Sequence, residues 1–317
     1  MVTIKEVEQA RQRITGAVYR TPLERSRWLS DEQGREVLFE LECFQPTGSF
    51  KIRGAMAKLT ALSAAETSRG ILAVSAGNHG LAVAHCAEAL RLNATIIVPE
   101  SASRAKVEGM RRYPVTVLER GANYDEAERA ARAMERETGA VFVSPYNDAE
   151  VIAGQGTVAL EILEDAPELD AIVVPVGGGG LLAGVCVAAK AIKPEIKVYG
   201  AEPAASPTMQ RALAAGRIIE IQEEETLADG LAGNIEPGSM TFPIIQRLVD
   251  GIIAVSEGEI AGAIAKVARN ERLMIEGAAA VGIAALADAR LAGSRVAAVV
   301  TGRNITLDLF RTVMRDA

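Results

Sequence analysis

The segment AIVVPVGGGGLLAGVCVAA, residues 171–189, contains no charged side chain. It is long enough to cross a bilayer as a helix, but Pro175 and four consecutive glycines argue against a spanning helix. A buried strand, a glycine turn and a buried helix account for the same residues, because strands of parallel sheets are apolar on both faces. We therefore expect a strand at 171–176 and a helix that starts at Leu181.

Short apolar runs alternate with helical patterns along most of the chain. We expect further strands at 71–74, 94–98, 115–118 and 296–300, and further helices at 78–90, 104–112, 124–137 and 305–313. Residues 3–6 are typical of a capping box that opens an amphipathic helix with Val7, Ala10 and Ile14 on one side. Strands that alternate with helices predict an α/β fold with parallel sheets.

Composition limits the classes of partner. The chain has 317 residues, 49% of them hydrophobic, which is enough for a sizeable core. Its net charge of −7 and the lack of a basic block exclude nucleic acid and anionic membrane as expected partners, so a small-molecule ligand is the expectation. Three widely spaced cysteines without a C-x-x-C pair predict neither a zinc site nor a disulfide framework. No targeting segment is recognisable at the N-terminus, so a cytoplasmic location is expected.

One lysine lies in an apolar, glycine-flanked segment, PTGSFKIRGA at residues 46–55. The segment is expected to run from a turn into a helix at Lys51. Burial disfavours an ammonium group and lowers its pKa, so Lys51 could bind an aldehyde cofactor as a Schiff base. By itself the pattern is weak, since a lysine at a helix start is usually a solvated charge.

The four glycines of residues 177–180 lie where a strand ends and a helix begins, a position at which backbone N–H groups bind anions. A tight turn without a ligand is one alternative. A dinucleotide-binding loop is another, because Gly178, Gly180 and Ala183 match G-x-G-x-x-A and Glu202 follows at about the right distance. That interpretation gives Lys51 no role, and no second mononucleotide half is visible.

Two more loops follow expected strands. Residues 75–80, SAGNHG, open a helix and suit a carboxylate, although simple capping by Ser75 or Asn78 would also explain them. Residues 301–304, TGRN, come directly after the last expected strand. Because ligands of α/β proteins bind at the carboxyl ends of parallel strands, these loops together with Lys51 outline a single site.

Taken together, these segments resemble the fold-type II pyridoxal-phosphate enzymes, specifically the threonine/serine dehydratase and serine racemase group. The resemblance covers nearly the whole chain. Residues 46–55 are similar to the Schiff-base segment of that family, 75–80 to its substrate loop, 152–157 to a helix of its larger domain, and 177–181 to its phosphate loop.

The resemblance implies a role for each site residue. Lys51 would form the Schiff base with pyridoxal 5'-phosphate, with Phe50 beside the ring, Asn78 on its phenolic oxygen and Thr301 at its pyridine nitrogen. The remaining roles are phosphate binding by Gly177, Gly178, Gly179, Gly180 and Leu181, and binding of the substrate carboxylate by Ser75, Gly77, Asn78 and His79.

The resemblance also implies an architecture and a reaction. Two lobes of open, twisted, parallel-type sheets are expected: a larger one from residues 1–67 and 148–317, and a smaller mobile one from 68–147. The implied reaction is dehydration and deamination of L-threonine or L-serine to a 2-oxo acid and ammonia by a homodimer. Because the sequence stops at Ala317, without a C-terminal regulatory domain, a catabolic role is expected. Dehydratases of hydroxyaspartate or of the hydroxyectoine pathway, and a racemase of the same family, are the alternatives, with a nicotinamide-dependent dehydrogenase as the alternative from another class.

Three departures from the family pattern bear on specificity. Ala76 replaces the serine of racemizing relatives, so racemization is expected to be slow or absent. Thr208 stands six residues after Glu202, where metal-binding relatives have a second carboxylate, so no metal site is expected. Arg303 replaces a common glycine. It is either a surface or structural charge, or the partner of a second carboxylate on a hydroxyaspartate-like substrate.

Overall fold

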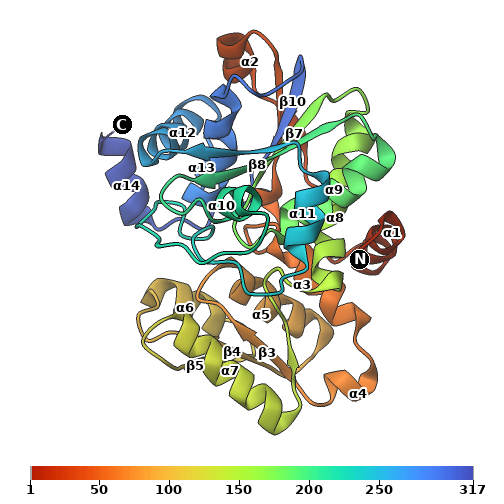
Figure 1. Ribbon diagram of the computed structural model, residues 1–317. Coiled ribbons are helices and arrows are strands. Elements are labelled where there is room, and N and C mark those ends of the chain that lie inside the picture. The colour runs from red at the N-terminus through yellow and green to blue at the C-terminus, as the bar shows by residue number, and fades with distance from the viewer. Residues whose placement is uncertain (1, 317) are drawn as a thin grey trace.

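The structure, a computed structural model, describes residues 2–316. It contains two sheets, each flanked by helices, stacked one above the other in Figure 1. Apolar clusters fill the space between each sheet and its helices. The expected α/β architecture with parallel-dominated sheets is confirmed.

The larger sheet has six strands in the order β1-β2-β10-β7-β8-β9. Its neighbours pair in parallel except β1 and β2, which are antiparallel. The strands are β1 (Leu23–Arg25), β2 (Glu36–Glu40), β7 (Ala171–Pro175), β8 (Lys197–Pro203), β9 (Gly251–Val255) and β10 (Arg295–Val299).

The smaller sheet has four parallel strands in the order β5-β4-β3-β6. They are β3 (Ile71–Val74), β4 (Ala94–Val98), β5 (Thr116–Glu119) and β6 (Val141–Phe142). All four lie within the 68–147 range expected for the smaller lobe. The mobility of that lobe, and its limits, stay predictions.

The helices follow the expected alternation with strands. They are α1 (Ile4–Ile14), α2 (Arg27–Gln33), α3 (Lys51–Ala61), α4 (Ala64–Thr67), α5 (Asn78–Leu90), α6 (Arg104–Arg111), α7 (Tyr124–Thr138), α8 (Ala149–Asp165), α9 (Gly180–Ile192), α10 (Thr208–Ala215), α11 (Thr241–Leu248), α12 (Glu257–Asn270), α13 (Gly277–Ala284) and α14 (Leu307–Asp316), with 3-10 turns at Glu42–Phe44 and Ala285–Ala287. The capping box at Thr3 and Glu6 is present, and Val7, Ala10 and Ile14 are buried as expected.

Side chains of β7 alternate between two cores. Ile172 and Val174 pack in the cluster that contains α9, whereas Ala171 and Val173 pack in the cluster that contains α13. Because successive strand residues point to opposite faces, helices cover both faces of the six-stranded sheet. The uncharged segment is therefore a buried strand, a turn and a buried helix, as expected. No helix within residues 2–316 is long and apolar enough to cross a membrane.

Glycines let α3, α8 and α9 approach one another at backbone distance. A Cβ on Gly154 of α8 would lie 2.6 Å from the Arg53 carbonyl oxygen of α3. A Cβ on Gly184 of α9 would lie 2.3 Å from the carbonyl oxygen of Ile152. Helix α3 also packs against α5, which covers the four-stranded sheet. The helix that begins at Lys51 is thus anchored to both halves of the molecule.

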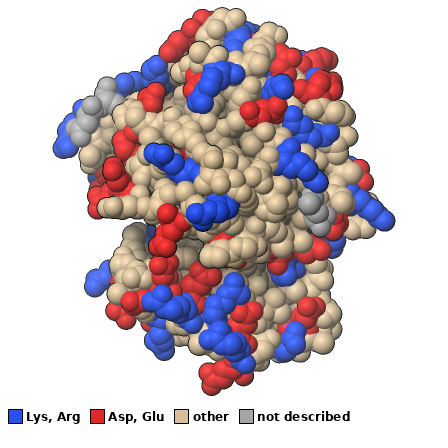
Figure 2. All heavy atoms as spheres, in the orientation of Figure 1, with Lys and Arg blue, Asp and Glu red and all other residues tan. Residues whose placement is uncertain are grey.

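The charged surface shows no area dominated by basic residues in the view of Figure 2. Lys and Arg side chains are interspersed with Asp and Glu over both halves, and the surface is indented between the upper and lower halves. This mixture agrees with a small-molecule ligand better than with a polyanion.

Candidate active site

Two segments far apart in the sequence pair side by side and bring Lys51 to the end of β10. Phe50 donates its N–H to the Thr301 carbonyl at 3.0 Å, and Arg303 donates its N–H to the Gly48 carbonyl at 3.0 Å. Between them, Ser49 and Gly302 form an isolated antiparallel bridge. The lysine segment and the 301–304 loop, expected to share one site, are therefore joined directly.

Lys51 is the first residue of α3, and its side chain is half-buried. Its Nζ donates a hydrogen bond to the Pro145 carbonyl oxygen at 3.0 Å and lies 5.2 Å from the centre of the Phe50 ring. Burial lowers the pKa of Lys51 to about 8, although the Glu276 carboxylate acts in the opposite direction. A lysine with this pKa has a substantial neutral fraction near neutral pH, which is what nucleophilic attack on a carbonyl requires.

Thr301 is buried, yet its Oγ1 has no hydrogen-bond partner among the described residues. The Oγ of its neighbour Ser49 is also buried and without a partner there. Leaving a buried hydroxyl unpaired typically costs about 1–3 kcal/mol, so such groups are rare unless a ligand uses them. The Thr301 hydroxyl thus marks a place where a polar ligand atom fits.

The glycine loop offers a group of backbone donors. The hydrogen bonds of residues 2–316 include no acceptor for the N–H groups of Gly177, Gly178, Gly179, Gly180 and Leu181. The last two residues open α9, so the positive end of that helix dipole points the same way. The Tyr146 side chain packs closely against the loop, since a Cβ on Gly178 would lie 2.4 Å from its ring. A phosphate is the kind of anion that such a group of donors binds.

A second group of donors lies at the start of α5. Gly77 is the N-cap of this helix and donates its N–H to the Ser75 hydroxyl at 3.0 Å. In the described structure, the N–H groups of Ala76, Asn78 and His79 have no acceptor. The loop therefore has the donors that a carboxylate needs, as the sequence predicts.

The His79 side chain does not belong to this donor group. Its Nε2 lies 2.9 Å from the Val143 carbonyl oxygen, and burial lowers the pKa of His79 to about 3, assisted by the nearby charge of Lys51. The imidazole is therefore neutral and donates Nε2–H to that carbonyl. Only the backbone N–H of His79 remains for a ligand.

Two residues that sequence reasoning missed complete the site. Asn78 donates Nδ2–H to Glu276 Oε1 at 2.7 Å, and Asn304 donates Nδ2–H to Asn78 Oδ1 at 2.6 Å. Glu276 directly precedes α13, and burial raises its pKa to about 7. Glu276 belongs to no recognisable local motif, and Asn304, although it lies in the 301–304 loop, was given no role of its own, so only the folded chain shows that they contact Asn78.

A buried charge cluster surrounds Arg53, two residues after Lys51 on the same helix. Arg53 is fully buried and donates to both oxygens of Glu42 and of Glu161. Glu40 lies in the same cluster, and burial beside Glu42 raises its pKa well above the ordinary value. Pairing of this kind satisfies charges that would otherwise be costly inside a protein, and it fixes the first turn of α3.

The side chains of two residues considered in the sequence analysis make their contacts elsewhere. Arg303 is exposed, and its guanidinium stacks over the Phe44 ring at 5.6 Å. No ion pair within residues 2–316 includes it. Glu202, considered as a ribose ligand, accepts the N–H groups of Met209 and Gln210 with its two carboxylate oxygens, at 3.0 and 2.9 Å. Glu202 therefore caps α10.

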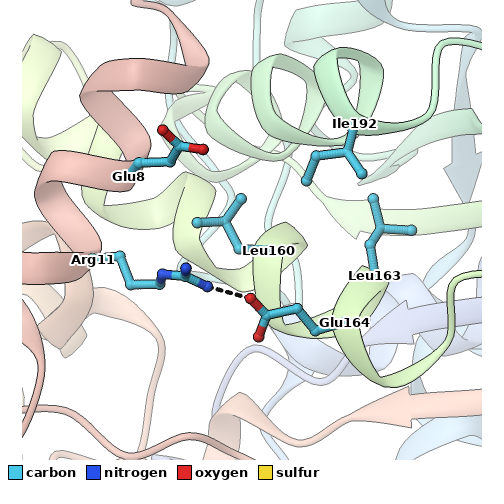
Figure 3. A pocket seen from close by; sticks show the side chains of 6 residues that line it. All are labelled: Glu8, Arg11, Leu160, Leu163, Glu164 and Ile192. Carbon is cyan, nitrogen blue, oxygen red and sulfur yellow. Dashed lines mark hydrogen bonds and ion pairs between the residues drawn. The ribbon is translucent and has the colours of Figure 1, made fainter.

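A separate hollow lies on the surface between α1, α8 and α9, shown in Figure 3. Its walls include Leu160, Leu163 and the exposed Ile192, with the Arg11 and Glu164 ion pair at one side. None of the expected site residues lines it. The donor groups described above, and not this hollow, define the candidate active site.

Comparison with known proteins decides the family. Residues 14–302 match the family model described as "Pyridoxal-phosphate dependent enzyme". The chain belongs to this family. It is 42% identical over 315 residues to the L-threonine ammonia-lyase of Thermotoga maritima, covering 99% of this chain and 78% of the relative.

Solved structures agree. The maize serine racemase is 35% identical with a TM-score of 0.94, covering 99% of this chain and 97% of the other. The serine racemase of Dictyostelium discoideum is 35% identical with a TM-score of 0.90, covering 96% and 99%, and a threonine deaminase from T.th. is 38% identical with the same TM-score and coverage. The fold is therefore that of the fold-type II enzymes, and the dinucleotide interpretation of the glycine loop is not supported.

The residues of this pyridoxal-phosphate-dependent enzyme fit its cofactor. The free N–H groups of the glycine loop match a phosphate, and the buried, unpartnered Thr301 hydroxyl matches a ring nitrogen. Lys51 is connected to both: the residue before it, Phe50, pairs with Thr301, and its Nζ contacts Pro145, whose neighbour Tyr146 packs on the glycine loop. The roles of the individual residues stay predictions.

Proposed function

We propose that this enzyme catalyses β-elimination of a β-hydroxy amino acid, L-threonine or L-serine, to a 2-oxo acid and ammonia. Lys51 would hold pyridoxal phosphate covalently. The observation that carries the proposal is a half-buried lysine of lowered pKa beside two groups of free backbone donors. The relative named L-threonine ammonia-lyase, 42% identical over nearly the whole chain, supports this choice of substrate.

Each residue of the site has a role in this reaction. Bound pyridoxal phosphate supplies an electron sink for the bonds of the substrate α-carbon. The N–H groups of residues 177–181 hold its phosphate, and those at the start of α5 orient the substrate carboxylate. The Nζ of Lys51, when free, would be the base that takes the proton from the substrate α-carbon.

Thr301 would influence whether elimination or exchange of the α-proton follows. A hydroxyl at the ring nitrogen, unlike a carboxylate, does not stabilise a protonated pyridine. Thr301 would therefore leave the bound cofactor a weaker electron sink, which would favour loss of the β-hydroxyl over exchange of the α-proton. A neutral His79 fits this arrangement, because its side chain is hydrogen-bonded to the Val143 carbonyl and brings no competing acid to the substrate.

Steady-state kinetics on L-threonine, L-serine and 3-hydroxyaspartate test the proposal, with ammonia and 2-oxo acid as the readouts. Lys51→Ala should abolish turnover. The control is Lys58→Ala on the same helix, where Lys58 pairs with Asp148 and should not matter for chemistry. Turnover by Lys51→Ala comparable to the wild type would overturn the proposal.

A dicarboxylate such as hydroxyaspartate is a second candidate substrate. Arg303 is exposed, lies two residues after Thr301 and pairs with no carboxylate within the described residues. If it binds a second substrate carboxylate, Arg303→Gly should reduce kcat/KM for hydroxyaspartate and leave that for L-threonine unchanged. Equal losses on both substrates would eliminate this candidate.

The proposal includes a cytoplasmic homodimer. The oligomeric state and the location rest on the sequence resemblance and composition alone, and they are independent of the proposed reaction. Light scattering of the purified protein gives the oligomeric state, and fractionation of the source cell gives the location. If the active species is a monomer, the proposed dimer is wrong and the proposed reaction is unaffected.

A further inference from the structure

Glu276 lies where the start of α13 meets the 301–304 loop. It is the N-cap residue of α13, and its own N–H donates to the Gly302 carbonyl at 3.2 Å. A Cβ on Gly302 would lie 2.3 Å from Glu276 Oε1, so any other residue at 302 would displace this carboxylate. Glycine next to Thr301 is thus needed to keep the carboxylate against the 301–304 loop.

The Glu276 carboxylate belongs to a closed ring of hydrogen bonds. Its Oε1 accepts from Asn78 Nδ2 at 2.7 Å, and its Oε2 accepts from the Asn304 backbone N–H at 3.1 Å. Asn304 Nδ2 then donates to Asn78 Oδ1 at 2.6 Å and to the Thr47 carbonyl at 2.9 Å. The ring therefore holds both ends of the Asn78 amide.

The chemistry of these partners fixes which way the Asn78 amide points. A carboxylate only accepts, so the Asn78 nitrogen must face Glu276. The Thr47 carbonyl also only accepts, so the nitrogen of Asn304 must face Thr47, and its second hydrogen is directed at Asn78 Oδ1. If the Asn78 amide were flipped, its oxygen would face the Glu276 carboxylate and its nitrogen would face Asn304 Nδ2, so neither contact could be a hydrogen bond.

One hydrogen of Asn78 Nδ2 remains after this ring is complete. Its oxygen accepts from Asn304, and one amide hydrogen goes to Glu276. The free hydrogen makes Asn78 a donor, and not an acceptor, toward a ligand. A donor of this kind stabilises the ionised form of a phenolic oxygen.

We propose that Glu276 is a positioning residue that fixes the Asn78 amide with its free N–H directed at the phenolic oxygen of the cofactor. The inference rests on the proposed function, in which Asn78 contacts that oxygen. Glu276 touches neither substrate nor cofactor in this arrangement, and its effect passes through Asn78.

Hydrogen bonds, more than the surrounding charges, support the ionised form of Glu276, because burial and Asp229 both raise its pKa. Lys51 lies close enough to be influenced by the carboxylate, while Asp229 and Lys106 form an ion pair at 2.6 Å that also acts on it. The two hydrogen bonds from Asn78 and Asn304 stabilise the ionised carboxylate against the opposing effect of burial. A neutral Glu276 would present a hydroxyl to one of two donors, so the ring requires the charge.

Glutamine at position 276 tests the inference because it keeps the size and removes one acceptor. A glutamine has one oxygen for two donors, so one of the contacts with Asn78 and Asn304 must be lost. In the holoenzyme of Glu276→Gln, we expect the dissociation constant of pyridoxal phosphate to rise about tenfold. We also expect absorbance to move from the visible band toward the shorter-wavelength band of the neutral phenol. Glu276→Asp, which keeps the carboxylate, should restore part of both properties.

The matched control is Glu202→Gln. Glu202 is likewise buried, has a pKa raised to about 7, and accepts two backbone N–H groups, but it does so at α10. A purely structural loss should destabilise this variant to a similar extent and leave the absorption spectrum unchanged. If Glu276→Gln does not fold, Asn304→Ala removes the opposite contact to Asn78 and should give the same spectral change.

A double-mutant cycle decides whether the effect passes through Asn78. In an Asn78→Ala background, Glu276→Gln should change cofactor affinity less than about twofold and leave the spectrum where Asn78→Ala puts it. If Glu276→Gln weakens cofactor binding by the same factor with and without Asn78, the inference is overturned. A wild-type protein that binds no pyridoxal phosphate at Lys51 would instead refute the proposed function, which is a separate outcome.

Discussion

Lys51 donates a hydrogen bond from Nζ to the carbonyl oxygen of Pro145, 94 residues further along the chain. This contact joins the start of α3, in the half that contains the six-stranded sheet, to the segment that leaves the four-stranded sheet. The next residue, Tyr146, packs against Gly178 and Gly180. The dipeptide Pro145-Tyr146 therefore connects the lysine to the glycine loop.

A side chain at Gly178 should damage this arrangement. The Cβ of Gly178→Ala would lie 2.4 Å from the Tyr146 ring, so the loop or the ring must shift. We expect the dissociation constant of pyridoxal phosphate to rise by about tenfold or more. Fluorescence titration of the apoenzyme measures it. Gly258→Ala, where a Cβ meets only open space, is the control, and equal affinities in the two variants would contradict the prediction.

The pKa of Lys51 predicts how cofactor attachment depends on pH. Only the neutral amine attacks an aldehyde, so the rate of attachment to the apoenzyme should rise with pH and level off near pH 8, where Lys51 titrates. An ordinary lysine would level off near 10.5. Removing the charge in Glu276→Gln should shift the midpoint downward, because that carboxylate raises the pKa of Lys51. Stopped-flow absorbance provides the rates, and a midpoint near 10.5 in the wild type would refute the lowered pKa.

Ala76 should keep racemization low. This residue lies in the loop that opens α5, at the position where the resemblance implies an acid on the face opposite Lys51, and alanine has no proton to give. We expect the wild type to form little D-serine from L-serine while it releases ammonia, and Ala76→Ser to form more. Chiral chromatography of the recovered serine measures both. Racemization by the wild type as fast as elimination would show that the acid comes from elsewhere.

Chelators should have little effect on activity. Both oxygens of Glu202 accept N–H groups of α10, and Thr208 donates its hydroxyl to the Gly233 carbonyl at 3.3 Å. The cluster of Glu40, Glu42 and Glu161 already contains the guanidinium of Arg53. We therefore expect kcat to be unchanged by EDTA and by added Mg²⁺. A loss of activity in EDTA that Mg²⁺ restores would reveal a cation that these contacts do not anticipate.

Much of the central sheet architecture could be predicted because buried parallel strands have simple sequences. The strand at 71–74 and the helix at 78–90 were expected at their observed limits. The strand β2 could not be recognised, because Glu36 and Glu40 at its two ends leave an apolar run of only three residues, and Glu40 is buried beside Thr21 and Glu42. Tertiary contacts override the local pattern there.

Some residues of the candidate site could likewise be predicted from the sequence, and others could not. Lys51, the glycine loop and Thr301 lie on segments whose glycines and strand ends carry a local signal. Glu276 and Tyr146 carry none, since each acts through a contact with a residue distant in the sequence. A single sequence shows which segments can bind an anion or an aldehyde, whereas the residues that orient them become visible only in the fold.

The point of cofactor attachment tests the role of Lys51 most directly. The purified holoenzyme is reduced with borohydride, digested and analysed by mass spectrometry, with and without prior incubation with L-threonine. We expect a single reduced pyridoxyl group on Lys51, and less of it after incubation with substrate. A pyridoxyl group on another lysine, or a protein that remains unlabelled after pyridoxal phosphate is supplied, would refute the assignment of Lys51.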